Sequence, residues 1–388
     1  MMLTAFSVIV QAAFSSPTDR VLVATPVKNA ANELPNYFAS LKSISYPKNL
    51  ITIAFLESDS TDQTDEVIRA FITLDSSEFG SVLYQRKPVG YSPPLNRHAE
   101  DIQLRRRQTL ARARNDVLDM VDLANFEYVL WLDADAVGFP DTLIQDLIGL
   151  RQDVVAPHVV WKLGGTTYDR NSWLELRPDE VWGEPLEHKD ARLPSESVMF
   201  EGYSNGIGRR IYLDDYRLLL SPGDRLATVP LNGVGTAVLL VKAQVHQKFR
   251  FPEQPFKRRL ESEGFGLLVF SNGIRPVGLP MYEIRHVNAE DGGWIYGGAA
   301  AYLNRMNRRL QRAERVKNGI PVVLFYETLE DFTDNLMHAI PINGVFLITL
   351  SICLTYLAIV GIRLLRRRLK VEPGRMSPKR RNRRSPTP

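Results

Sequence analysis

The first 160 residues alternate between short apolar runs and amphipathic stretches. A short apolar run bounded by turn residues predicts a buried strand, and apolar residues three or four positions apart predict one face of a helix. We predict strands at residues 20–25, 50–56, 82–85, 128–132 and 153–160. We predict helices at residues 32–41, 98–123 and 143–150, and a further helix that follows the second strand and ends near residue 74. This alternation is typical of a doubly wound α/β sheet.

The pattern becomes irregular after residue 160 and later recovers. Residues 161–230 combine Gly, Pro, Trp and Tyr without a regular period and are predicted to form loops. Order returns in a strand, a helix, a second strand and a basic helix, which end near residues 241, 270, 286 and 317. We therefore expect one α/β domain over residues 17–296 and a helical stalk over residues 297–338.

Residues 339–362 form a run of 24 residues without a charged side chain. At about 1.5 Å per residue, a helix of this length spans the hydrocarbon core of a bilayer. Arginines follow immediately at 363 and 366–368. The sequence therefore predicts a single transmembrane helix, with residues 363–388 in the cytoplasm and the preceding domain on the lumenal side.

The net charge of +4 is unevenly distributed along the 388 residues. Residues 363–388 contain eleven Lys or Arg and one acid, so this tail alone carries +10 and the rest carries −6 (4 − 10). The tail lacks aromatic residues, which favours lipid headgroups or an orientation signal over nucleic acid. Residues 1–16 are apolar and are interpreted as a short signal, with an uncleaved anchor or a truncated start as alternatives.

The predicted strand at 128–132 is followed by two acids, Asp133 and Asp135. Alternate residues of a strand point to the same side, and ligands of open α/β sheets bind at the carboxyl ends of strands. Two adjacent carboxylates repel each other unless a cation lies between them, and Mg²⁺ or Mn²⁺ carrying a diphosphate fits this need. The pair thus indicates a metal-dependent sugar-nucleotide transferase, and the alternative is a surface Asp-x-Asp turn.

Polar residues follow the first two predicted strands. Thr25 and Pro26 end the first strand, and Glu57, Asp59 and Asp62 follow the second. We expect Thr25, Pro26, Glu57 and Asp59 to contribute to nucleotide-sugar binding, with acceptors for a base and ribose after the second strand. The acidic segment also offers an N-cap for the next helix, and the alternative is that it is only a polar loop with a cap.

A cluster of arginines lies on the helix that precedes the Asp-x-Asp strand. Arg107 and Arg114 have helical spacing and share one face, which could meet a diphosphate. We expect Arg105 and Arg112 to be solvated. Arg114 and Asn115 are nearest the strand and are the better candidates for the site.

Two acids and one histidine occur late in the domain. Glu261 or Glu263 could face the reacting sugar or the acceptor hydroxyl, or could cap the helix that they begin. His286 closes a strand, where a neutral imidazole could complete the shell of a metal. The alternative for a lone histidine is a structural role.

Many ordered blocks of the chain resemble the fungal Golgi α-mannosyltransferases of glycosyltransferase family 62, the mannan-polymerase subunit family. The resemblance covers roughly residues 20–290 and is carried by LARARN at 110–115 with Arg106 before it, VLWLDAD at 129–135, LIQD at 143–146, YDRNSW at 168–173, EGY at 201–203, GVGT at 233–236, LVKAQVH at 240–246, FP at 251–252, PF at 255–256, ESEGF at 261–265 and GLPMY at 278–282. It implies a GT-A fold, GDP-mannose as donor, Mn²⁺ as cofactor and retention of the α configuration.

By the same resemblance, Asp133 and Asp135 would hold the metal diphosphate, His286 would be the third protein ligand and Glu263 would lie by the acceptor. The chain is thus expected to be a membrane-tethered Golgi mannosyltransferase, with the ER as the alternative compartment. Its expected partners are GDP-mannose, a mannose-containing glycan acceptor and homologous glycosyltransferase subunits, without nucleic acid. The rival interpretations are a transferase that uses another nucleotide sugar and a non-catalytic subunit of a glycosyltransferase complex.

Overall fold

A computed structural model of the protein describes residues 17–92, 94, 99–175, 198, 210–217, 219–221, 223–287 and 298–317. The chain divides into two compact units, Met1–Ile320 and Pro321–Pro388, and every described residue belongs to the first. The predicted signal at 1–16, the stalk beyond residue 317, the transmembrane helix at 339–362 and the tail at 363–388 lie outside the described residues. Within the described part of the chain, no helix is long and apolar enough to cross a membrane.

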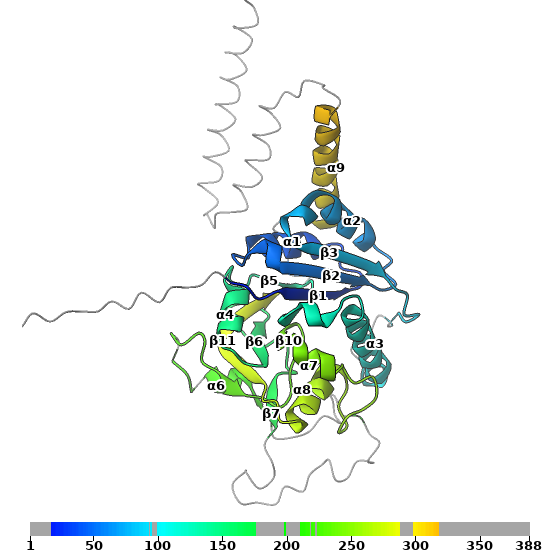
Figure 1. Ribbon diagram of the computed structural model, residues 1–388. Coiled ribbons are helices and arrows are strands. Elements are labelled where there is room, and N and C mark those ends of the chain that lie inside the picture. The colour runs from blue at the N-terminus through cyan, green and yellow to red at the C-terminus, as the bar shows by residue number, and fades with distance from the viewer. Residues whose placement is uncertain are drawn as a thin grey trace, which may run out of the picture. The chain divides into compact units, whose positions relative to one another are not determined.

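A mixed β-sheet forms the centre of the domain (Figure 1). In spatial order its main path is β3 (Ser81–Arg86), β2 (Ile51–Glu57), β1 (Val21–Val27), β4 (Tyr128–Leu132), β10 (Val238–Lys242), β6 (Val154–Val160), β11 (Val277–His286) and β5 (Ala136–Val137), while β9 (Val229–Pro230) pairs with β11. The pairs β3–β2, β2–β1, β1–β4 and β6–β11 are parallel. Strand β10 is antiparallel to both of its neighbours, β4 and β6.

Helices cover both faces of this sheet, because alternate strand residues are apolar on both sides. Val21 and Val23 belong to one buried cluster, and Leu22 and Ala24 belong to the other. The first cluster includes residues of α1 (Leu34–Ser43), α2 (Thr64–Asp75), α4 (Leu143–Gly149) and α9 (Gly298–Lys317). The second includes residues of α3 (Glu100–Leu118), α6 (Leu213–Arg217), α7 (Ala243–Lys248) and α8 (Glu261–Ser271).

The α/β class and the predicted order of strands and helices are confirmed for the described residues. Three features differ from the expectation. Strand β10 runs against the parallel direction, the helix predicted at 98–123 ends at Leu118, and the irregular region contains a small sheet of β7 (Trp173–Glu175) and β8 (Arg210–Tyr212). A strand's direction is set by its partners, so periodicity along the chain does not encode it.

A buried histidine is hydrogen-bonded to a side chain of strand β4. The indole N–H of Trp131 donates a hydrogen bond of 2.9 Å to Nε2 of His246, and both side chains are fully buried. Because Nε2 accepts, Nδ1 carries the proton, and it lies 3.2 Å from the carbonyl oxygen of Phe249. Burial lowers the pKa of His246 to about 3, so the imidazole is neutral at physiological pH.

This neutral histidine predicts a pH-dependent stability. The unfolded chain binds a proton at His246 below about pH 6.5 and the folded chain does not, so the free energy of unfolding decreases as the pH falls. Between pH 7.5 and 5 we expect His246 to contribute a loss of about 2 kcal/mol. The variant His246→Gln keeps an acceptor for Trp131. Urea unfolding at several pH values should show that its free energy of unfolding falls by about 2 kcal/mol less than that of the wild type over this pH range. Equal pH dependence in both proteins would contradict the assignment.

Candidate active site

Asp133 and Asp135 follow β4 and are bonded to residues that flank β10 and β11. Strand β4 ends at Leu132, and the two acids occupy the turn between β4 and β5 rather than the strand itself. The N–H of Asp133 donates to the carbonyl of Ala237 beside β10 at 2.9 Å, and the carbonyl of Asp135 accepts from Val287 after β11 at 2.8 Å. The strand alternation used to predict their common side therefore does not apply, and backbone bonds to two other strands fix their positions.

Asp133 lies among an excess of acids. Burial raises its pKa to about 7, and the negative charges of Asp135, Glu261 and Asp169 act in the same direction against the opposing charge of Arg114. The Asp133 side chain is 31% exposed, so its carboxylate can be reached by a ligand. A cluster of this kind binds cations, because a positive charge relieves the repulsion between the carboxylates.

Arg114 is the buried cation of this cluster. Its Nε donates to Oε1 of Glu261 at 2.8 Å, and Nη2 donates to Oδ1 of Asp133 at 3.3 Å. Burial alone would raise the pKa of Glu261, but the charge of Arg114, the hydrogen bonds from Ser262 and the charge of Arg107 together hold it below its usual value. The third nitrogen, Nη1, is buried and has no hydrogen-bond partner within the described part of the chain.

Glu261 begins α8 with an unusual backbone. Its φ is +51°, in the left-handed region that costs energy for a residue with a side chain. The carboxylate also accepts from the hydroxyls of Thr236 at 3.2 Å and Ser262 at 2.6 Å. These bonds and the pair with Arg114 hold Glu261 in this conformation.

His286 ends β11 beside Asp135. Its Nε2 lies 2.9 Å from Oδ2 of Asp135, and the residue is only 4% exposed. The other ring nitrogen, Nδ1, has no hydrogen-bond partner among the described residues. The imidazole is stacked on Tyr168, with 3.5 Å between ring centroids, and the ring of Trp161 lies at 5.5 Å. Two ligands at right angles around a small divalent cation are also about 3 Å apart. The spacing of these two atoms therefore fits two ligands of one metal ion.

The polar residues that follow β1 and β2 are mostly occupied within the protein. Thr25 is buried and shares a hydrogen bond of 2.5 Å with the hydroxyl of Tyr37. Glu57 is buried, accepts from the N–H of Ser60 at 2.7 Å and pairs with Arg86. Pro26 is half-buried on β1 next to Thr25. These side chains shape the carboxyl end of the first two strands.

The two aspartates after β2 hold neighbouring loops. Asp59 accepts from the N–H groups of Val89 and Gly90, at 3.0 and 2.9 Å. Asp62 accepts from the N–H of Thr64, the first residue of α2, but the N-cap position is Gln63, whose side chain makes no cap bond, so the expected N-cap from the acidic segment is not formed. The bonds of Asp59 therefore order the segment after β3, a role that the sequence did not indicate.

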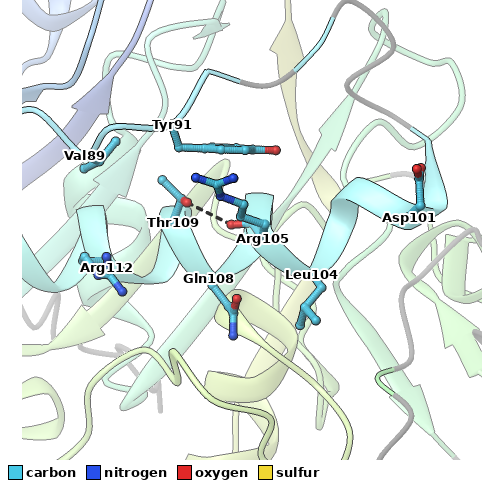
Figure 2. Close-up of a pocket in the computed structure, with 8 residues that line it drawn as sticks. All are labelled: Val89, Tyr91, Asp101, Leu104, Arg105, Gln108, Thr109 and Arg112. Atoms are coloured by element: carbon cyan, nitrogen blue, oxygen red, sulfur yellow. Dashed lines mark hydrogen bonds between the residues drawn. The ribbon is translucent and has the colours of Figure 1, made fainter.

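The arginines of α3 separate into two faces, as their spacing predicts. Arg107 and Arg114 are buried, whereas Arg105 and Arg112 line a cavity of about 430 Å³ on the outer side of the helix (Figure 2). There the guanidinium of Arg105 lies 4.8 Å from the ring centroid of Tyr91, and Arg112 pairs with Glu253. Arg105 and Arg112 thus do not join the acids of the cluster.

Asn115 and Glu263 are engaged in structural contacts. The Asn115 amide donates to the carbonyl of Phe251 at 3.0 Å and accepts from its N–H at 2.9 Å. Glu263 is fully buried and accepts from Arg107 and Arg210 at 3.1 Å each, and from the indole of Trp173 at 3.3 Å. Of the two acids of α8, Glu261 is the one that reaches the Asp-x-Asp residues through Arg114.

Asp169 is a member of the cluster that sequence reasoning did not single out. It accepts from the N–H groups of Asn171 and Ala237, at 3.1 and 3.2 Å, and burial raises its pKa. A Cβ atom at Gly235 would collide with the Asp169 carboxylate. The Gly-x-Gly motif at 233–235 was therefore the available signal, since glycine there permits the close approach of an acid.

Comparison with known sequences places this chain in a defined family. The chain matches the Anp1 family over residues 8–255 and belongs to that family. It is 33% identical over 288 residues to the mannan polymerase II complex anp1 subunit of Schizosaccharomyces pombe, across 70% of this chain and 65% of that subunit. The chain thus spans slightly less than two thirds of that relative's length.

A second relative and one solved structure complete the comparison. The mannan polymerase complex subunit mnn9 of Schizosaccharomyces pombe is 33% identical across 70% of this chain and 80% of that subunit. Among solved structures, the mannosyltransferase PcManGT from Pyrobaculum calidifontis, in complex with GDP-Man and Mn²⁺, has a TM-score of 0.40 and 15% identity over 72% of this chain and 60% of that chain.

The pair of Arg114 and Glu261 predicts a large loss of stability on truncation. Arg114→Met removes the cation from a buried carboxylate, so we expect the free energy of unfolding to fall by about 3 kcal/mol. Arg112→Met, on the exposed face of the same helix, should change it by about 0.5 kcal/mol or less. Denaturant unfolding of both variants measures the difference, and similar losses in the two would contradict the role of Arg114.

Proposed function

We propose that the protein is a GT-A glycosyltransferase that transfers mannose from GDP-mannose to a mannose-containing glycan acceptor with retention of the α configuration. The observation that carries this proposal is the convergence of Asp133, Asp135 and His286 after two strands, in a chain of the Anp1 family. The names of the relatives, subunits of mannan polymerase complexes, support the choice of sugar.

Asp133, Asp135 and His286 would hold a divalent cation, Mn²⁺ or Mg²⁺. No group of three His, Cys, Asp or Glu side chains in the described ranges already has the geometry of a metal site. The fit rests instead on the crowded carboxylates and on the approach of His286 Nε2 to within 2.9 Å of Oδ2 of Asp135. Oxygen ligands from the donor diphosphate would complete the shell, as is usual for hard cations. When bound, the metal would neutralise charge that develops on the leaving diphosphate.

Other residues of the chain would orient the donor and acceptor. Arg114 holds Asp133, and its buried Nη1 bonds to none of the described residues, so it would support negative charge at the diphosphate side. The ends of β1 and β2, with Thr25, Pro26, Glu57 and Asp59, would form the nucleotide side. Glu263 would act near the acceptor as part of its buried network with Arg107 rather than as an exposed base.

The rival proposal is a non-catalytic subunit that binds nucleotide and organises partners. The hydrogen bonds that Glu263 accepts from three donor side chains favour this non-catalytic role, because the carboxylate has no exposed surface from which to take up a proton. In either case we propose a lumenal domain at the Golgi membrane, or at the ER, in association with homologous subunits. A hydrolysis panel of nucleotide sugars distinguishes GDP-mannose from other donors, and mannose transfer distinguishes the two roles.

The metal assignment predicts the effect of one isosteric substitution. Asp135→Asn keeps the volume of the side chain and removes its charge, so we expect the loss of transfer and of Mn²⁺-dependent GDP binding with unfolding temperature preserved. Asp141→Asn, an exposed acid beyond the site, is the matched control and should bind GDP normally. Calorimetric titration of GDP with Mn²⁺, and with a chelator, measures both. Full activity of Asp135→Asn would exclude this metal site.

His286 provides a second test of the same site. His286→Ala removes the nitrogen that lies beside Asp135, and we expect the affinity for Mn²⁺ to fall by about tenfold or more. Electron paramagnetic resonance of free Mn²⁺ in a titration measures this affinity without turnover. An unchanged affinity would assign His286 to a structural role.

A further inference from the structure

A short hairpin follows β6 at the edge of the candidate site. The chain turns back at residues 161–167, where the N–H of Trp161 donates to the carbonyl of Thr166 at 3.2 Å and Val160 pairs with Thr167. Gly164, with a φ of +74°, occupies the tight turn. The hairpin ends at Tyr168, whose ring stacks on His286.

Charged side chains of β11 and α6 hold this hairpin in place. The N–H of Gly164 donates to Glu283 of β11 at 2.7 Å, and Arg217 of α6 donates to the carbonyl of Gly165 at 3.1 Å while it pairs with Glu283 at 2.7 Å. Thr167 is bonded to Asp214 and to the buried His158. The tip is therefore fixed in place relative to β11, which carries His286.

The tip nevertheless exposes large apolar side chains. Trp161 is 39% exposed and Leu163 is 56% exposed. The indole contacts Tyr168 with 4.7 Å between ring centroids and an interplanar angle of 84°, and it lies 5.5 Å from the His286 ring. An aromatic side chain that is held firmly and still exposed beside a polar site is typical of a binding surface.

We propose that Trp161 is a stacking surface for a sugar ring of the acceptor glycan, an inference that rests on the proposed transferase function. One face of a pyranose ring is lined with C–H groups that pack on an indole, and the sugar hydroxyls stay free for the polar groups around it. Because Trp161 lies next to His286, a ring bound there would be adjacent to the metal and the donor diphosphate. The acceptor, rather than the nucleotide, fits this place because the nucleotide side lies at β1 and β2.

Binding of an α-linked mannotriose to the full-length chain tests this inference. By calorimetry, Trp161→Ala should weaken mannotriose binding by about tenfold, as for truncation of an aromatic anchor, and Trp161→Phe should retain most of it. Leu163→Ala is the matched control, since it removes an exposed apolar side chain of the same hairpin and should leave the affinity unchanged. The affinity for GDP with Mn²⁺ should be the same in all three variants.

Four results would overturn the inference. Unchanged mannotriose affinity in Trp161→Ala would remove the stacking surface, and an equal loss in Leu163→Ala would show that the effect comes from the hairpin as a whole rather than from stacking on the indole. A parallel loss of Mn²⁺ and GDP affinity would make Trp161 a positioning residue for His286. If the wild-type chain binds mannotriose through Trp161 but does not bind GDP-mannose, the proposed donor is wrong and the acceptor surface stands. Binding of GDP-mannose without mannotriose would instead overturn the acceptor surface alone.

Discussion

The contact of Arg114 with Glu261 and Asp133 is the interaction on which the site depends. Without this buried guanidinium, the carboxylates around the end of β4 would repel one another in an environment that already disfavours their charge. Arg114 comes from α3, Asp133 follows β4 and Glu261 begins α8. One ion-pair network therefore joins the central sheet to two helices that cover the same face.

The charged groups of the domain fall into two sets. On the buried side, Glu263 is surrounded by donors from Arg107, Arg210 and Trp173 and has an internal role. By contrast, the side chain of Asp135 is 38% exposed and lies 2.9 Å from Nε2 of His286. The number of donors that each carboxylate accepts from and its exposure, rather than the number of acids, distinguish the candidate cation site from the buried ion-pair network.

Local patterns predicted the described elements well, and long-range chemistry less well. The apolar run at 128–132 and the face formed by Arg107 and Arg114 were evident from spacing alone. The roles of Asp59 and Asn115 were not, because their partners are the backbone groups of Val89 and Phe251, and any sequence offers such groups. Asp169 escaped notice because only the fold brings it under Gly235.

The late position of β10 in the chain has a consequence for the order in which the parts of the domain close during synthesis. Strand β4 pairs on one side with β1, which is synthesised earlier, and on the other with β10, which leaves the ribosome much later. Loop closure across this distance is slow, and Glu261 and His286 follow later still. A nascent chain thus carries Arg114 and Asp133 well before their remaining partners, so the acidic cluster is among the last parts of the domain to close.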